Sequence, residues 1–208
     1  MKLKMTLLFL LISISNYAQN EKPEYDYEIM RTEIVYQHNA DSTLTKLYNK
    51  NNELLNGKYR IIHEDSVVTY VNFKSGLWDG LYKSYYKTGE LYAVILFENG
   101  IKKGIGIWYF KNGNKNREIS YLNRQQHGVC KWYYENGNIF KECEFINDKE
   151  NGKSKWYYEN GTVQLLITYK NGLKNGLSVK YKQDGTIENQ LYFLNNKKVS
   201  KDEFDKSE

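Results

Sequence analysis

GVCKWYYENG, at residues 128–137, decides the fold, because it returns as GKSKWYYENG at residues 152–161 and is preceded by GIGIWYFKNG at residues 104–113. The spacing is 24 residues, and it holds from Gly80 to Gly176 at one position and from Phe97 to Phe193 at another. A fixed period of this length indicates a repeat array. Such an array presents a continuous surface, so binding or scaffolding is the first functional expectation.

Each repeat has the composition of a β-hairpin. Two runs rich in Trp, Tyr, Ile and Val flank an Asn-Gly or Asp-Gly pair, as at Asn136-Gly137, and this pair is the strongest short-range hairpin signal. Long helices are disfavoured because Gly and Asn recur too often. We predict an all-β fold, an elongated, solenoid-like antiparallel sheet of about six consecutive β-hairpins with a 24-residue period.

The register of one hairpin predicts where the two cysteines lie relative to each other. A two-residue type I′ turn at Asn136-Gly137 fixes which residues face each other across the strands. The resulting pairs are Tyr134 with Ile139, Trp132 with Lys141, and Cys130 with Cys143. The chain has only two cysteines, and this register places them opposite each other at a closely spaced site. Two hypotheses stay open: a disulfide between Cys130 and Cys143, or two half-buried thiols.

The two faces of the predicted sheet differ in character. One face carries a row of tryptophans (Trp108, Trp132 and Trp156), and we assign it to the packed side. The opposite face carries one tyrosine in each repeat among lysines and glutamates. These candidate partner-binding residues are Tyr85, Tyr109, Tyr133, Tyr157 and Tyr181. Mutual packing of neighbouring hairpins is the alternative explanation for the tyrosines.

A single sheet cannot bury its apolar face alone. Either the ribbon coils until its aromatic residues cover one another, or the N-terminal segment, a second copy bound by self-association, or a partner covers this face. The sequence leaves these alternatives open.

The ends of the array have their own composition. Residues 1–18 combine Lys2 and Lys4 with a short apolar run and Ala18, which is the layout of a signal peptide. We therefore expect an exported protein, periplasmic or extracellular, that is soluble after cleavage near Ala18 and has no membrane span. The rest divides into a polar linker (19–31), a degenerate N-terminal hairpin (32–56), the repeat array (57–196) and a disordered tail (197–208).

The motif [Tyr/Phe]-x-Asn-Gly-x-x-x-Gly-x-x-x-Trp-Tyr-Tyr-x-Asn-Gly is best seen between Lys153 and Tyr169 and in neighbouring repeats. It resembles the MORN-repeat family, and in particular the bacterial variant found in exported proteins and in proteins named as antitoxins. The resemblance covers residues 57–196. It implies a ribbon of hairpins used for binding and no catalytic residue.

The residues themselves offer no catalytic constellation. The three histidines stand apart from one another, and no Cys or His spacing suggests zinc. The glycines belong to the 24-residue period rather than to a phosphate-binding loop. The net charge of +5 is interspersed along the chain, without the basic stripe of a nucleic-acid-binding protein. We therefore predict a protein without enzymatic activity, cofactor, metal or nucleic-acid partner.

The leading hypothesis is an exported, non-enzymatic array that binds or scaffolds proteins through the tyrosine row, because tyrosine provides rigid contact area at low entropic cost. One alternative is a glycan-binding envelope protein, whose aromatic rings would stack on sugars. Another is an antitoxin-like or immunity-like protein that neutralises a toxin, which is suggested only by the names used in the family.

Overall fold

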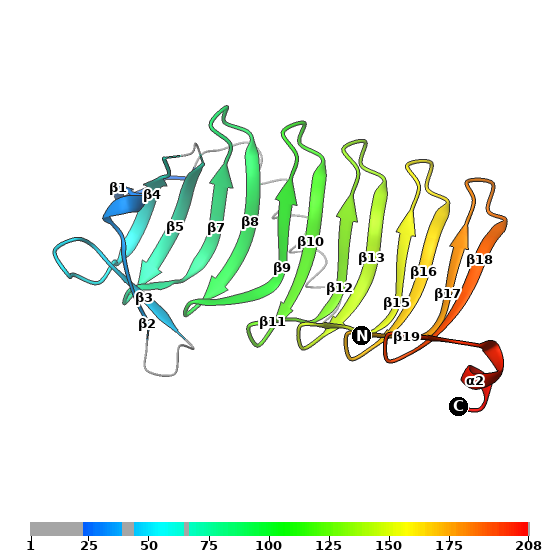
Figure 1. Cartoon of the computed structure of the whole chain (residues 1–208). Helices are drawn as coiled ribbons and strands as arrows, with labels where there is room; N and C mark the ends of the chain where they lie inside the picture. Colours follow the sequence, from blue (N-terminus) through cyan, green and yellow to red (C-terminus); the bar gives the residue numbers. More distant parts are fainter. Residues whose placement is uncertain (1–22, 39–43, 65–66, 208) are drawn as a thin grey trace, which may run out of the picture. The chain divides into compact units, whose positions relative to one another are not determined.

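The structure is a computed structural model that describes residues 23–38, 44–64 and 67–207. The predicted signal peptide, residues 1–18, lies outside this part of the chain. The chain divides into two compact units, unit 1 (Met1–Ile101) and unit 2 (Lys102–Glu208). Strands connected as hairpins dominate both units (Figure 1).

Six consecutive antiparallel hairpins within the described residues confirm the predicted all-β fold. Unit 1 contains β4 (Gly57–Ile62) with β5 (Val68–Lys74), and β7 (Gly80–Tyr85) with β8 (Leu91–Glu98). The next two hairpins are β9 (Ile101–Tyr109) with β10 (Lys115–Leu122), and β12 (Gly128–Tyr133) with β13 (Ile139–Ile146). The last two are β15 (Gly152–Tyr157) with β16 (Val163–Lys170), and β17 (Leu173–Tyr181) with β18 (Ile187–Leu194). The short strands β6 (Leu77–Trp78), β11 (Gln125–Gln126) and β14 (Lys149–Glu150) extend the pairing between hairpins.

The turn at Asn136-Gly137 differs from the prediction. The Tyr134 N–H donates to the Asn138 carbonyl at 2.8 Å, and the Gly137 N–H donates to the Tyr134 carbonyl at 3.0 Å. The loop therefore has three residues, of which only Gly137 has a positive φ, at 91°. This is a type I turn closed by a glycine bulge rather than a two-residue type I′ turn.

Two-residue turns with two positive φ values occur instead at the opposite end of the hairpins. Ile146 pairs with Lys149 around Asn147 and Asp148, whose φ values are 51° and 63°. These are the signs that a type I′ turn requires. Asn and Asp tolerate this region because their short polar side chains hydrogen-bond locally.

A β-bulge next to the three-residue loop also changes the predicted strand pairing. Trp132 pairs with Lys141 as predicted, but Tyr133, not Tyr134, pairs with Ile139, which leaves Phe140 as the extra residue. The prediction for Tyr134 was wrong because loop and bulge shift the register near the turn. Farther from the turn, the shift caused by the longer loop and the shift caused by the bulge cancel, so Cys130 pairs with Cys143 as predicted.

A glycine faces an aromatic residue at the same place in every full repeat. Gly152 pairs with Tyr169, for example, and has a φ of 79°. The other pairs are Gly80–Phe97, Gly104–Tyr121, Gly128–Phe145 and Gly176–Phe193. Such an aromatic residue can cover a strand position that has no side chain of its own, which explains why the two series share one period.

The N-terminal segment covers one face of the unit 1 sheet. A buried cluster joins Ile34, Leu47 and Leu55 of this segment to Val71 and Phe73 of β5. Its hairpin is formed by β2 (Val35–His38) and β3 (Thr45–Tyr48). In unit 1, the N-terminal segment therefore covers the apolar face.

Unit 2 is built differently. All its strands belong to one sheet, to which β19 (Lys197–Val199) adds the last strand. The remaining element, α2 (Lys201–Asp205), contacts β18. Within residues 102–207, the sheet of unit 2 is therefore a single layer of hairpins.

Both flanking segments contain structure that the sequence did not predict. The expected linker contains β1 (Tyr27–Met30), which pairs in parallel with β4 and is followed by the 3₁₀ helix η1 (Arg31–Glu33). The expected disordered tail contains β19 and α2. Ser200 caps α2 by accepting a hydrogen bond from the Glu203 N–H at 3.2 Å, and Phe204 packs 5.4 Å from Tyr192 between ring centroids. The cap and the ring contact order a segment whose composition is polar.

Candidate functional site

The five predicted tyrosines occupy the last position of the first strand of their hairpins. Tyr85 and Tyr109 are buried, with 6% and 4% of their surface exposed, whereas Tyr133, Tyr157 and Tyr181 are half-buried. Burial raises the pKa of Tyr85 to about 12. Burial also raises the pKa of Tyr133, and the Glu118 carboxylate, which accepts a hydrogen bond from its hydroxyl at 2.6 Å, adds to this effect.

The half-buried tyrosines lie on the face of the unit 2 sheet that we call the tyrosine face. Alternating charges cross four neighbouring strands of this face, in the order Glu118, Lys131, Glu142 and Lys155. The Lys131 Nζ lies 3.3 Å from Glu142 Oε2. Directly opposed unlike charges stabilise a sheet locally, and they leave this face with a mixed, balanced charge.

Exposed apolar side chains also lie on the tyrosine face. Val129, paired with Glu144, is 51% exposed, and Ile187, paired with Tyr181, is 55% exposed. Ile146, at the end of β13, is 40% exposed. The tyrosine face thus combines partly accessible aromatic rings, exposed aliphatic groups and paired charges, which is a composition suited to a protein contact.

The opposite face of unit 2, the tryptophan face, is filled by its own side chains. The Arg117 guanidinium lies over the Trp108 ring at 4.4 Å, and the Lys141 ammonium lies between Trp132 and Trp156, at 5.3 and 4.7 Å from their ring centroids. These cations and rings are cross-strand neighbours. The ring faces are therefore occupied by cation–π contacts within the sheet.

Cys130 and Cys143 lie on the tryptophan face beside Lys141. Both are buried, with 0% and 2% of their surface exposed. Burial raises the pKa of both, that of Cys143 to about 12. A reactive cysteine needs a lowered pKa, so these thiols lack nucleophilic character. The disulfide between them remains a prediction.

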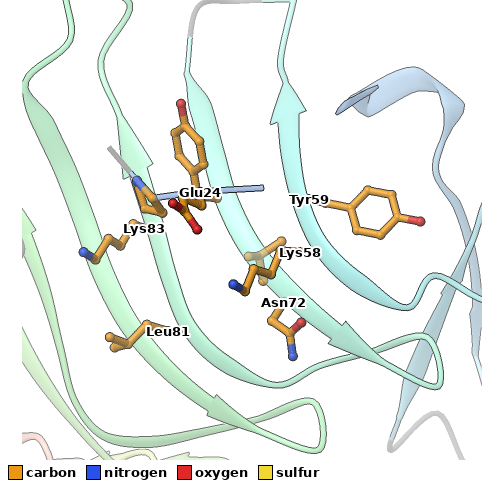
Figure 2. A pocket seen from close by; sticks show the side chains of 9 residues that line it. Glu24, Lys58, Tyr59, Asn72, Leu81 and Lys83 are labelled. Carbon is orange, nitrogen blue, oxygen red and sulfur yellow. The ribbon is translucent and has the colours of Figure 1, made fainter. Parts of the chain in front are cut away.

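Unit 1 contains a groove on its outer face, which is the face turned away from the N-terminal hairpin. The cavity has a volume of about 360 Å³. In Figure 2, Lys58, Asn72, Leu81 and Lys83 project from the strands, and Glu24 of the N-terminal segment lies over them. Sequence reasoning missed this groove, because Glu24 falls in the expected linker, far along the chain from Lys58 and Lys83.

Metal-binding and membrane-spanning features were sought in residues 23–38, 44–64 and 67–207. No group of three or more His, Cys, Asp and Glu side chains in these ranges is placed to hold a metal ion. No helix there has the length and apolar character needed to cross a membrane. The absence of a catalytic, metal or cofactor site remains a prediction.

The repeat hairpins match a known family. The model of this family, described as MORN repeat variant, matches residues 78–99, 102–123, 126–147 and 150–171. No curated protein matches the chain. The hairpins β4–β5 and β17–β18 lie outside the matched segments, although Gly176 faces Phe193 in β17–β18 as in the matched repeats. The chain is therefore a repeat protein that carries four tandem MORN repeat variants, at residues 78–171.

Proposed function

We propose that this protein is a non-enzymatic repeat protein that binds a protein partner through the tyrosine face of unit 2. The observation that carries the proposal is the contrast between the two faces of this single-layered sheet. The tryptophan face uses its rings in internal cation–π contacts. The tyrosine face leaves Val129 and Ile187 more than half exposed beside half-buried tyrosines.

The composition of the tyrosine face favours a protein over a glycan as the ligand. Tyrosines with polar tips and apolar bodies are enriched at protein interfaces, and two of the charges between them, Lys131 and Glu142, are paired with each other. A glycan site needs open aromatic ring faces, and the faces of Trp132 and Trp156 are in contact with Lys141.

We further propose that binding takes place outside the cytoplasm. This part of the proposal is supported by the leader-like composition of residues 1–18. Its test is a fusion of the full chain to a reporter enzyme that is active only after export. A reporter that stays inactive, although the fusion protein accumulates, would contradict this part.

The binding proposal is tested by affinity capture with the full chain and two matched variants. Tyr157→Ala removes a ring from the tyrosine face, and Leu165→Ala removes a side chain from the tryptophan face that is also half-buried. Circular dichroism and urea midpoints establish that both variants are folded. We expect a partner that is retained by the native chain and by Leu165→Ala but lost by Tyr157→Ala. Equal retention by both variants would contradict the assigned face, and competition by soluble polysaccharide would favour a glycan ligand.

A further inference from the structure

An N-terminal strap, Pro23–Met30, lies along the sheet of unit 1. Its second half, β1, adds a parallel strand to β4 and pairs Tyr27 with Tyr59. Its first half is held by two hydrogen bonds to Lys58. The Asp26 N–H donates to the Lys58 carbonyl at 2.9 Å, and the Lys58 N–H donates to the Asp26 side chain, at Oδ2, at 3.1 Å. The strap is therefore recognised through both its backbone and an acidic side chain.

The aromatic side chain between the first two acids of the strap, Glu24 and Asp26, contacts the outer face of unit 1. The Tyr25 ring lies 5.9 Å from the Tyr70 ring, measured between centroids, and the Arg60 guanidinium lies 5.9 Å from the Tyr25 ring centroid. Arg60 also forms an ion pair with Glu28. The outer face of unit 1 thus offers an aromatic surface and a cation to the tyrosine of the strap.

The first acid of the strap lies in the groove. Glu24 lines it together with Lys58, Lys83 and Asn72 (Figure 2). Burial lowers the pKa of Lys83, because the groove removes water from its ammonium. A carboxylate that approaches this ammonium would offset the lost water.

The strap occupies this surface without being buried in it. Within Pro23–Met30, only the Ile29 side chain is buried, whereas Tyr25 is 45% and Tyr27 is 53% exposed. The part of the strap at Glu24–Asp26 has no buried side chain, and such a segment opens at a small free-energy cost. A second segment with the same chemistry can therefore compete for the surface.

We propose that the groove and the adjoining outer face of unit 1 form a binding site for an extended acidic peptide segment of a partner protein. The segment carries the pattern carboxylate–aromatic–carboxylate, and the strap's Glu24-Tyr25-Asp26 occupies the site as an intramolecular ligand. Lys58 and Lys83 attract the first carboxylate, Tyr70 and Arg60 hold the aromatic ring, and the Lys58 N–H accommodates the second carboxylate. The site lies in unit 1 and does not depend on the tyrosine face of unit 2, so either proposal can fail alone.

The test measures binding of a fluorescent peptide with the sequence of residues 23–30 to the full chain by anisotropy. The double variant Tyr25→Ala/Asp26→Ala loosens the strap, and we expect it to bind the peptide about tenfold more tightly than the native chain, which corresponds to about 1.4 kcal/mol. Adding Lys58→Glu and Lys83→Glu to this variant should weaken binding at least about tenfold. Rising salt should weaken it as well, because charge attraction is screened.

Two controls make the outcome decisive. Lys153→Glu/Lys170→Glu reverses two exposed charges in unit 2 and, in the strap-loosened background, should leave binding unchanged. A peptide in which both carboxylates are replaced by amides should bind more weakly than the acidic peptide. Circular dichroism confirms that each variant is folded. No binding to the folded strap-loosened variant, or binding that survives the reversal of Lys58 and Lys83, would overturn the proposal.

Discussion

The Lys141 ammonium lies 4.7 Å from the centroid of the Trp156 ring, which belongs to the next hairpin of unit 2. Lys141 and Trp156 are cross-strand partners at the junction of β13 and β15. The same ammonium forms an ion pair with Glu150, and both side chains are 17% exposed. One lysine therefore links two repeats through a ring and a carboxylate, which makes it a suitable probe of how the hairpins hold together.

Lys141→Met should lower the free energy of unfolding by about 1–3 kcal/mol, because it leaves the mostly buried Glu150 carboxylate without its cationic partner. Lys141→Met/Glu150→Met should recover stability to within about 1 kcal/mol of the native chain, since an apolar pair can replace a buried ion pair. Urea unfolding of both single variants and the double variant measures the coupling. Strictly additive losses would show that the pair contributes no interaction of its own.

Gly152→Ala should destabilise the protein by about 1–2 kcal/mol, because the glycine φ of 79° is strained for alanine. Space is not the cause, since the nearest atom to an added Cβ would be Glu144 Oε2 at 3.8 Å. Gly152→Asn should cost less, because asparagine tolerates this region. Equal urea midpoints for the alanine variant and the native chain would contradict the assigned backbone conformation.

Stability should fall with rising pH above about 9. Burial raises the pKa of Cys143 from 9.0 to about 12 and that of Tyr85 from 10.0 to about 12. The folded state therefore holds protons that the unfolded state releases first. This stabilisation is complete below pH 9 and is lost as the pH rises toward 12. Urea unfolding of the reduced protein between pH 8 and 11 measures the decline, and Cys143→Ala should reduce the part that begins near pH 9, to which Cys130 also contributes. A constant free energy of unfolding over this range would refute the expectation.

The reactivity and number of free thiols distinguish a disulfide between Cys130 and Cys143 from two buried thiols. In the reduced, folded protein, Cys130 and Cys143 should react very slowly with a disulfide reagent at pH 8, because burial limits access and raises both pKa values. After unfolding without reductant, a count of two thiols would exclude a disulfide in protein isolated from its native compartment, and a count of zero would establish it. Rapid reaction of the folded protein would contradict the burial.

The sequence predicted the strand pairing within a repeat correctly where the alternation of side chains along a strand alone determines it. The pairs Cys130–Cys143 and Trp132–Lys141 follow from strand alternation and a nearby turn. The pair Tyr134–Ile139 was wrong because an Asn-Gly pair also suits a three-residue loop closed by a glycine bulge. The bulge offsets this shift immediately, so that Trp132 still pairs with Lys141, and the sequence did not reveal either change.

The sequence could not predict contacts that depend on a second segment of chain. Alternation placed Tyr85 on a face, but it did not show that Tyr85 would pack 5.6 Å from Tyr70 and become buried. The strap is a stronger example, because Asp26 and Lys58 meet across 32 residues. A polar composition around Pro23 favoured a linker, and only the strand pairing of β1 with β4 shows its place.

The most direct test of the central claim is photo-crosslinking in the native host with a photoreactive residue at one of two positions. Position 157 probes the tyrosine face, and position 165 probes the tryptophan face of the neighbouring strand. We predict a discrete crosslink to a single protein from position 157 and none from position 165. Crosslinking from position 165 alone, or none from position 157 in the folded protein, would contradict a protein-binding role for the tyrosine face.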